Sequence, residues 1–516
     1  MKGKDHITGP AFLLVLGRTV GMVSAFAIGP VVARAFSIED VGTYKQFFLV
    51  FATLYGLAQL GMAESLYYFV PRGAGRTGRY VCNAAITLAA AGLTTLALLW
   101  MARDGVADYF NHPAIAGYIL PIGLFLTFML VGTVLEIMMV SRKQHMSAAI
   151  TYALSDIGRT ALFILPALLV ASLRAVFFGA VVYAALRLAV MLALVWRQFG
   201  REFRPDLRLW RTQLAYALPF ALAVGIEAIL INYHQLFVAR SVGLETFAVY
   251  AQGVMTIPFM DLVVTSTTSV MMVKMAEIAA DRNAALALYH DTVSRLAFLL
   301  CPLTVALVVL AQPFIVTLYT AKFAASVPVF MVWALTIVPM MFAADAVLRA
   351  FAQTRFLLVM NIIRFVVVAT LIGWLIGSFS LVGAVIATLS ALMAAKIAGL
   401  LRIAHILHVS VARVLPWRTL ASITARAGAA ALPAWWLSQL FSSTPWLALL
   451  AGGTAYGVGY LVLCYAPGIA EPAAIRLPVL ERASELPIVR RAIAMHRARK
   501  AASYVAVAPV ASRGDH

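Results

Sequence analysis

The sequence has few charged residues and very few cysteines. Charged residues make up 12% of its 516 positions, whereas 63% of the positions are hydrophobic. That much apolar surface does not fit into a water-soluble core of ordinary proportions, so the composition predicts a membrane protein with many spans. The three cysteines, Cys82, Cys301 and Cys464, fall in separate apolar stretches, and they predict neither a disulfide framework nor a thiolate metal site.

Motifs of nucleotide-driven and hydrolytic proteins are also missing. The sequence contains no P-loop, dinucleotide fingerprint, nucleophile elbow or HExxH motif, so ATP-driven transport has no support. The longest loop on the predicted outer side, at about 103–116, is short. A membrane glycan polymerase or ligase would need a sizeable external loop with catalytic residues, and we therefore expect a protein that is not an enzyme.

Long apolar runs dominate what is present. Together they predict an all-α polytopic membrane protein with fourteen transmembrane helices, since about 20 apolar residues span a bilayer. The runs lie at about 11–36, 44–69, 80–102, 117–140, 149–171, 173–196, 213–236, 246–272, 291–312, 326–348, 356–377, 380–401, 420–441 and 445–467. No small-residue cleavage pattern follows the first run, so we expect it to stay on the chain.

The net charge of +19 is distributed unevenly between the two predicted sides of the membrane. With the N-terminus inside, 28 basic residues fall in inner segments and six fall near outer ends. Because cytoplasmic loops are enriched in Lys and Arg, both termini are predicted in the cytoplasm, and the charge does not indicate nucleic-acid binding. Arg34 and Arg240 are two of the six outer residues, and their long side chains are expected to snorkel to the interface.

An internal repeat divides the chain. Residues 33–46 return as residues 239–252 with five of fourteen positions identical, each at the junction of two apolar runs. This predicts two six-helix lobes related by an internal repeat, plus two extra helices. The predicted parts are an N-lobe at 1–198 with helices 1–6, a basic cytoplasmic inter-lobe linker at 199–212, a C-lobe at 213–408 with helices 7–12, helices 13–14 at 409–467, and a basic cytoplasmic tail at 468–516.

Cations within the spans are the candidate substrate-binding residues. Arg18, Arg187 and Arg364 have no acid within four residues on their own helices, so their partners must come from another helix or from a ligand. A guanidinium stays charged and binds phosphate oxygens in a bidentate manner, which suits a dry anion site. Arg159, in contrast, has Asp156 three residues earlier and is predicted to pair with it.

Acids within the spans are candidates for ion coupling. Glu64, Glu227, Asp261 and Asp345 could bind Na⁺ or H⁺. No spacing selects among these four residues. No cofactor and no metal site is predicted, because His405 and His408 have no third ligand nearby.

Several segments resemble one family of transporters. Residues 33–44, 238–250, 311–323 and 381–388 are similar, in order and spacing, to the polysaccharide-transporter branch of the multidrug/oligosaccharidyl-lipid/polysaccharide (MOP) exporter superfamily. The resemblance covers helices 1 to 12, and it departs from the family pattern at Phe36 and Ser37, where a Leu-Gly pair is usual. It implies a flippase of the bacterial inner membrane that translocates a polyprenyl-diphosphate-linked oligosaccharide for exopolysaccharide or O-antigen biosynthesis.

The resemblance further implies alternating access of two lobes around a cationic cavity, with Arg18 in the region of helix 1 where such flippases often have a cavity arginine. Membrane lipids and proteins of polysaccharide biosynthesis are the expected partners, besides the lipid-linked glycan. Two alternatives share the fold. They are a cation-coupled multidrug exporter, for which an acid-dominated binding lobe is expected, and a peptidoglycan-precursor lipid flippase.

Overall fold

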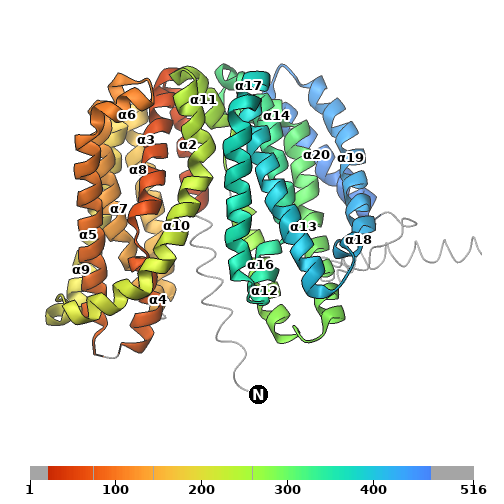
Figure 1. The fold of residues 1–516 in the computed structure, drawn as a ribbon. Helices are drawn as coiled ribbons and strands as arrows, with labels where there is room; N and C mark the ends of the chain where they lie inside the picture. Colours follow the sequence, from red (N-terminus) through yellow and green to blue (C-terminus); the bar gives the residue numbers. More distant parts are fainter. Residues whose placement is uncertain (1–20, 74, 143–144, 258–259, 466–516) are drawn as a thin grey trace, which may run out of the picture.

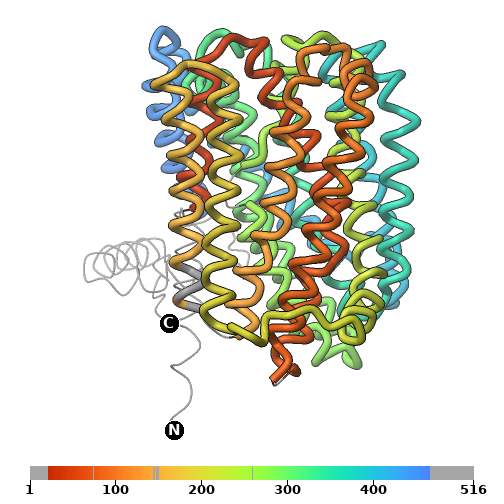
Figure 2. The backbone as a smooth tube through the Cα atoms, turned by 90° about the vertical axis from the view of Figure 1, so that its left-hand side faces the viewer, coloured from red at the N-terminus to blue at the C-terminus, as the bar shows by residue number. Residues whose placement is uncertain are grey.

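All regular structure in the described part of the chain is helical. The computed structural model describes residues 21–73, 75–142, 145–257 and 260–465. Figure 1 shows two helical bundles side by side, with α3 to α9 in one and α12 to α20 in the other. In the perpendicular view of Figure 2 the long helices run along one common direction, as expected of helices that cross a bilayer.

The elements of the first half follow one another with short connections. They are α2 (Ile28–Ala35), α3 (Ile38–Ala58), α4 (Met62–Arg72), α5 (Thr77–Met101), α6 (Arg103–Tyr109), the 3₁₀ helix η1 (Pro113–Tyr118), α7 (Ile119–Ser141), α8 (His145–Leu169), α9 (Leu173–Phe199) and η2 (Gly200–Glu202).

The second half begins with α10, which rises from the foot of the first bundle toward the second (Figure 1). Its elements are α10 (Leu207–Ser241), α11 (Leu244–Gly253), α12 (Met260–Glu277), α13 (Arg282–Val309), α14 (Ala311–Tyr319), η3 (Ala321–Ser326), α15 (Val327–Ala334), η4 (Leu335–Phe342), α16 (Ala344–Ala350), α17 (Thr354–Leu407), α18 (Val411–Val414), α19 (Trp417–Leu440) and α20 (Pro445–Tyr465).

The chain is a multi-pass membrane protein. Within the described residues, nine helices are long and apolar enough to cross a bilayer, or ten if the bent pair of α3 and α4 forms one span. Large apolar side chains such as Leu154, Phe178, Leu222 and Trp374 are exposed on the outside of the bundles. A soluble protein would rarely expose so many, whereas lipid solvates them well.

Nine or ten helices that are long and apolar enough are fewer than the fourteen predicted spans. The difference comes from a few segments of the chain. The predicted span 11–36 lies partly outside the described residues. The predicted span 246–272 is interrupted between α11 and α12. Helix α19 ends one residue before the end of the predicted span 420–441 and is not among the helices that are long and apolar enough. The predicted spans 356–377 and 380–401 both fall in α17.

The long element α17 is a hairpin of two helices rather than one straight rod. Its backbone leaves the helical region at Phe379 and Ser380, where Ser380 has φ +54°. A Cβ on Gly383 would collide with the carbonyl of Leu375, so glycine allows the second half to fold back against the first. The break at 379–380 thus separates the two predicted spans.

The two copies of the repeated segment have the same local backbone. Phe36 and Val242 are both extended, and each donates its N–H to the helix that it terminates. The following residues, Ser37 and Gly243, both cap the next helix with φ −63°. Residues 33–46 and 239–252 therefore form equivalent helix–break–helix junctions.

The segment predicted as the basic inter-lobe linker, 199–212, is mostly helical and is bonded to the first bundle. Helix α9 continues to Phe199 and α10 begins at Leu207. Between them, Asp206 forms a 2.9 Å ion pair with Arg79, and Asn83 exchanges two 3.0 Å hydrogen bonds with the Asp206 backbone. The Leu209 amide and the Arg79 guanidinium hold the pKa of Asp206 below its usual range. The foot of α10 is fixed to α5.

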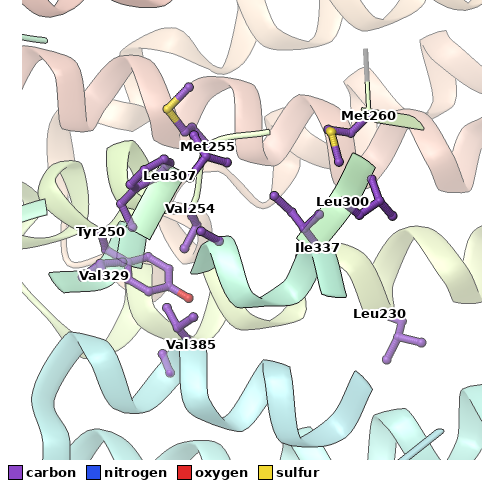
Figure 3. Close-up of a cluster of buried hydrophobic side chains, with 14 of the residues drawn as sticks. Leu230, Tyr250, Val254, Met255, Met260, Leu300, Leu307, Val329, Ile337 and Val385 are labelled. Carbon is purple, nitrogen blue, oxygen red and sulfur yellow. The ribbon is translucent and has the colours of Figure 1, made fainter. Parts of the chain in front are cut away.

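Apolar packing in each bundle joins helices that are distant in sequence. In the first bundle Phe47 stacks on Phe177 with ring centroids 4.0 Å apart. Figure 3 shows a corresponding cluster of the second half, in which Leu230, Tyr250, Leu307, Ile337 and other buried side chains meet. Because lipid tails are as apolar as these side chains, close packing and dispersion, rather than removal from water, hold the helices together.

Candidate substrate and ion cavity

A cavity of about 650 Å³ lies in the second half, between α10, α12, the segment from α15 to α16, and α17. Such a volume is typical of small-ligand sites. Helices from the whole second half bring charged side chains to its wall, namely Glu227, Asp261, Asp345, Arg349, Arg364 and Lys396.

Four of the predicted functional residues therefore meet in one place. Glu227, Asp261 and Asp345 are sequence candidates for ion coupling, and Arg364 is a candidate for substrate binding. Sequence analysis did not select Lys396 or Arg349 for the site. Lys396 carried a usable signal, since it is a cation within a predicted span, whereas Arg349 was assigned to an inner loop.

A broken helix places Asp345 on the cavity wall. The span at 321–350 is divided into η3, α15, η4 and α16, with Pro339 inside η4. Ala343, directly before α16, has φ +47°, a left-handed conformation that costs energy for a residue with a Cβ. Such strain is concentrated at functional sites, and discontinuous helices form ion and substrate sites in many transporters.

One ion pair is formed within the cavity. The Lys396 ammonium lies 2.5 Å from a carboxylate oxygen of Asp345. The lysine side chain is 12% exposed and the aspartate side chain 48% exposed. The carboxylate of Asp345 therefore contacts Lys396 and is at the same time accessible from the cavity.

The other four charged residues are free to bind a ligand. Within the described residues, the side chains of Glu227, Asp261, Arg349 and Arg364 form no hydrogen bond and no ion pair. Arg364 is attracted electrostatically by Glu227 and Asp345 without touching them. The described wall of this cavity thus has three acids and three bases, so it is balanced in charge. The cationic cavity between the lobes that the resemblance implies stays a prediction.

Neutral polar and aromatic groups complete the wall. Trp333 is held by a 3.0 Å hydrogen bond from its indole N–H to the carbonyl of Met255. The ring of His234 lies 5.3 Å from that of Trp333 and shares a 2.7 Å hydrogen bond with the Tyr250 hydroxyl. Hydroxyl groups come from α12 and its neighbours, at Thr256, Thr265, Thr268, Ser269, Thr336 and Thr388.

Comparison with known families identifies the chain. The sequence pattern of a family described as polysaccharide biosynthesis protein matches residues 31–328, which is more than half of the chain. The chain belongs to this family. The matched region includes Glu227 and Asp261, whereas Asp345, Arg364 and Lys396 lie beyond it.

Solved structures share the fold of this polysaccharide biosynthesis protein. A lipid II flippase MurJ in an inward closed conformation has a TM-score of 0.68 at 12% identity, covering 88% of this chain and 97% of its own. An inward-facing multidrug resistance MATE family transporter has a TM-score of 0.58 at 15% identity, and the match covers 77% of this chain and 98% of that transporter. A MOP superfamily transporter from Pyrococcus furiosus has a TM-score of 0.53 at 15% identity, and the match covers 77% of this chain and 96% of that transporter. No curated protein matches the sequence.

These findings agree on a transporter rather than an enzyme. The family gives the biological context, polysaccharide biosynthesis, and the structural likenesses give the MOP superfamily fold. The chain is a multi-pass polysaccharide biosynthesis transporter of this fold. Among the described residues no three of His, Cys, Asp and Glu gather to hold a metal ion.

Arg187, a predicted substrate-binding residue of the transporter, lies outside this cavity. Its guanidinium is 2.5 Å from Glu136 on α7, and it also donates to the Tyr183 hydroxyl at 3.3 Å. The side chains of Arg187 and Glu136 are 16% and 5% exposed. The partner from another helix is thus a glutamate, and substrate binding by Arg187 stays a prediction.

The remaining sequence candidates are also apart from the cavity. Glu64 lies in the first turn of α4, half-buried, and one of its carboxylate oxygens is buried without a hydrogen-bond partner in the described part of the chain. Arg159 pairs with Asp156 at 2.9 Å, which confirms that prediction. Arg18 and the predicted tail at 468–516 lie outside the described residues.

Proposed function

We propose that this transporter flips a polyprenyl-diphosphate-linked oligosaccharide across the bacterial inner membrane, for exopolysaccharide or O-antigen biosynthesis, by alternating access to the cavity. The observation that carries the proposal is the presence of two unpaired guanidinium groups, Arg364 and Arg349, beside unpaired carboxylates in one cavity of a polysaccharide biosynthesis protein. In the proposal the diphosphate binds to the arginines, because guanidinium matches phosphate oxygens in charge and geometry.

The rest of the wall suits a sugar. Carboxylate oxygens of Glu227 and Asp261 can accept hydrogen bonds from sugar hydroxyls, and the threonine hydroxyls can donate or accept. The fixed ring of Trp333 adds a rigid amphipathic surface. A cavity wall with equal numbers of acids and bases can thus bind a ligand that combines an anionic diphosphate with many hydroxyl donors.

The proposed topology has fourteen spans, two six-helix lobes with the boundaries predicted from the sequence, and both termini in the cytoplasm. It is supported by the 28-to-6 partition of basic residues. Labelling of single cysteines with an impermeant reagent tests it. Exposed position 205 should be protected in intact cells, and Gly105, whose Cβ direction is open, should react.

Ion coupling is assigned to Asp345, with Glu227 and Asp261 as further acids of the same wall, and Glu64 as a separate candidate in the first bundle. A bound Na⁺ or H⁺ would compete with the Lys396 ammonium for the Asp345 carboxylate. Binding of the ion would therefore release Lys396 toward the cavity, which links ion occupancy to the charge presented to the substrate.

A leaflet-resolved assay of lipid-linked glycan tests the function in cells that lack the chromosomal copy. Arg364→Ala should reduce flipping at least about tenfold at normal abundance, and Arg364→Lys should rescue poorly because bidentate contact is lost. Arg18→Ala and Arg18→Lys test the predicted partner from the other lobe. Arg355→Ala, an exposed arginine of the same helix outside the cavity wall, is the matched control. Normal flipping by Arg364→Ala would contradict the proposal.

A cation-coupled multidrug exporter is the second candidate, and the three carboxylates of the wall favour it. It predicts that drug efflux, rather than glycan translocation, depends on Glu227 and Asp261. A peptidoglycan-precursor flippase would also use the arginines, so the leaflet-resolved assay should follow both kinds of lipid-linked glycan.

A further inference from the structure

We propose that Arg34 and Arg240, which occupy equivalent positions in the two copies of the repeat, form a pair of latches that closes one end of the transporter. In the proposed topology this is the outer end. The inference rests on the proposed alternating access but not on the identity of the substrate.

The first latch joins the junction of α2 and α3 to the second bundle. From the last turn of α2, Arg34 donates a hydrogen bond to the backbone carbonyl of Thr317 in α14. In the reverse direction, Lys322 of η3 donates to the carbonyl of Phe36 at 2.5 Å. Two cations thus cross between the bundles in opposite directions, each to a carbonyl at the end of a helix.

The second latch joins the end of α10 to the first bundle. The Arg240 guanidinium lies over the ring of Tyr109, 5.2 Å from its centroid. The side-chain amide of Asn111 donates to the carbonyl of Arg240 at 3.1 Å. Arg240 therefore contacts α6, and its carbonyl accepts from Asn111 after that helix. In the first latch Arg34 contacts α14, and the carbonyl of Phe36 accepts from Lys322 of η3.

The two latches are counterparts under the repeat. Arg240 follows Arg34 by 206 positions, and Thr317 follows Tyr109 by 208. The segments that the two arginines contact also have the same order of elements. Helix α6 is followed by the six-residue 3₁₀ helix η1, and α14 is followed by the six-residue 3₁₀ helix η3. Sequence analysis predicts snorkelling for both arginines, and each one, exposed as expected, also contacts the opposite repeat.

Close packing accompanies the latches at the same end. Helices α3 and α11 approach so closely at Gly42 that a Cβ there would lie 2.6 Å from the backbone oxygen of Leu244. Gly42 and Leu244 belong to the two copies of the repeated segment. The copies thus pack against each other at the end where the arginines bind, and access to the cavity from this end requires both latches to open.

Accessibility of the cavity tests the latches without any glycan. In a background without Cys82, Cys301 and Cys464, a reporter cysteine at the cavity residue Thr268 is labelled from outside intact cells with an impermeant maleimide. We expect labelling to accelerate about fivefold in Arg34→Gln and in Arg240→Gln, and about 25-fold in the double variant. The first variant loses the side-chain hydrogen bond to Thr317 and the second loses the cation–π contact with Tyr109, and each loss shifts the same open–closed equilibrium.

Arg174→Gln is the matched control, since Arg174 is an exposed arginine at the same end for which the described residues provide no hydrogen bond or ion pair. A second reporter at Gly105 should label equally in all variants. If the double variant accumulates poorly, Lys322→Met carries the same test. An unchanged labelling rate at position 268 in a well-expressed latch variant would overturn the inference. Faster labelling in the latch variants, together with absent glycan flipping by the protein with its unaltered sequence, would uphold the latches and reject the proposed substrate.

Discussion

The two halves of the transporter each contain an ion pair between distant helices, and the pairs differ in their access to the cavity. Glu136 and Arg187 are 51 residues apart, as are Asp345 and Lys396. The second pair follows the first by 209 positions, which exceeds the 206-residue step of the repeat by about one helical turn. The glutamate is 5% exposed, but its counterpart Asp345 is 48% exposed.

The cause of the difference is the helix that carries each acid. In the first half α7 runs without a break through Glu136, so the carboxylate stays between packed helices. In the second half the chain breaks at η4 and Ala343 before α16 begins. The break turns Asp345 toward the cavity. The same arrangement of helices therefore encloses the ion pair between packed helices where the helix of the acid is continuous. Where that helix is interrupted, the ion pair faces the cavity and a ligand can reach it.

Loss of Arg187 should have the largest effect on stability. Arg187→Met removes the cation that lies 2.5 Å from the buried Glu136 carboxylate, and we expect a loss of about 3–5 kcal/mol and low abundance. Thermal unfolding of purified protein in detergent measures the change.

The double variant Glu136→Gln with Arg187→Met is the control, because it removes both charges and should recover most of the stability. A stable Arg187→Met variant that fails to flip glycan would instead return Arg187 to the substrate-binding residues.

Loss of Asp345 should have an intermediate effect. Asp345→Asn strands the Lys396 ammonium, whose side chain is only 12% exposed, and we expect a loss of roughly 1–3 kcal/mol. Any dependence of transport on Na⁺ or on the proton gradient should also weaken. Ion titrations of transport in vesicles, normalised to protein amount, separate the two effects. An unaltered ion dependence would exclude Asp345 from coupling.

Sequence analysis anticipated much of this arrangement but could not distinguish the two pairs. Helical spans, the junctions of the repeat and the Asp156–Arg159 pair all follow from apolar runs and local spacing. Arg187 and Arg364 were indistinguishable, because each lacks an acid on its own helix. Only tertiary packing brings Glu136 to Arg187 and places Arg364 on the wall of the cavity. The partners are 51 residues apart, beyond the reach of any local rule.

Loss of Lys396 should change stability little. Lys396→Met leaves Asp345 half exposed to the cavity, where water can hydrate its carboxylate, so we expect less than about 1 kcal/mol. Transport should respond more strongly, by severalfold, because the carboxylate no longer has an internal competitor for the coupling ion. Unfolding temperature and initial transport rate should be measured on the same preparation. A loss of stability as large as that of Arg187→Met would show that the two pairs are equivalent.

The smallest effect is expected at the local pair of α8. Asp156 and Arg159 are neighbours on one helix, with side chains 24% and 31% exposed, so their interaction needs no tertiary packing. Such pairs contribute about 0.2–0.5 kcal/mol, and Asp156→Asn should lower stability by about that amount. Asp156→Asn, Arg159→Gln and the double variant form a cycle that isolates the pair energy in thermal unfolding. A coupling energy near that of Glu136 and Arg187 would mean that α8 also holds its charges away from water and lipid, and the distinction between local and tertiary pairs would fail.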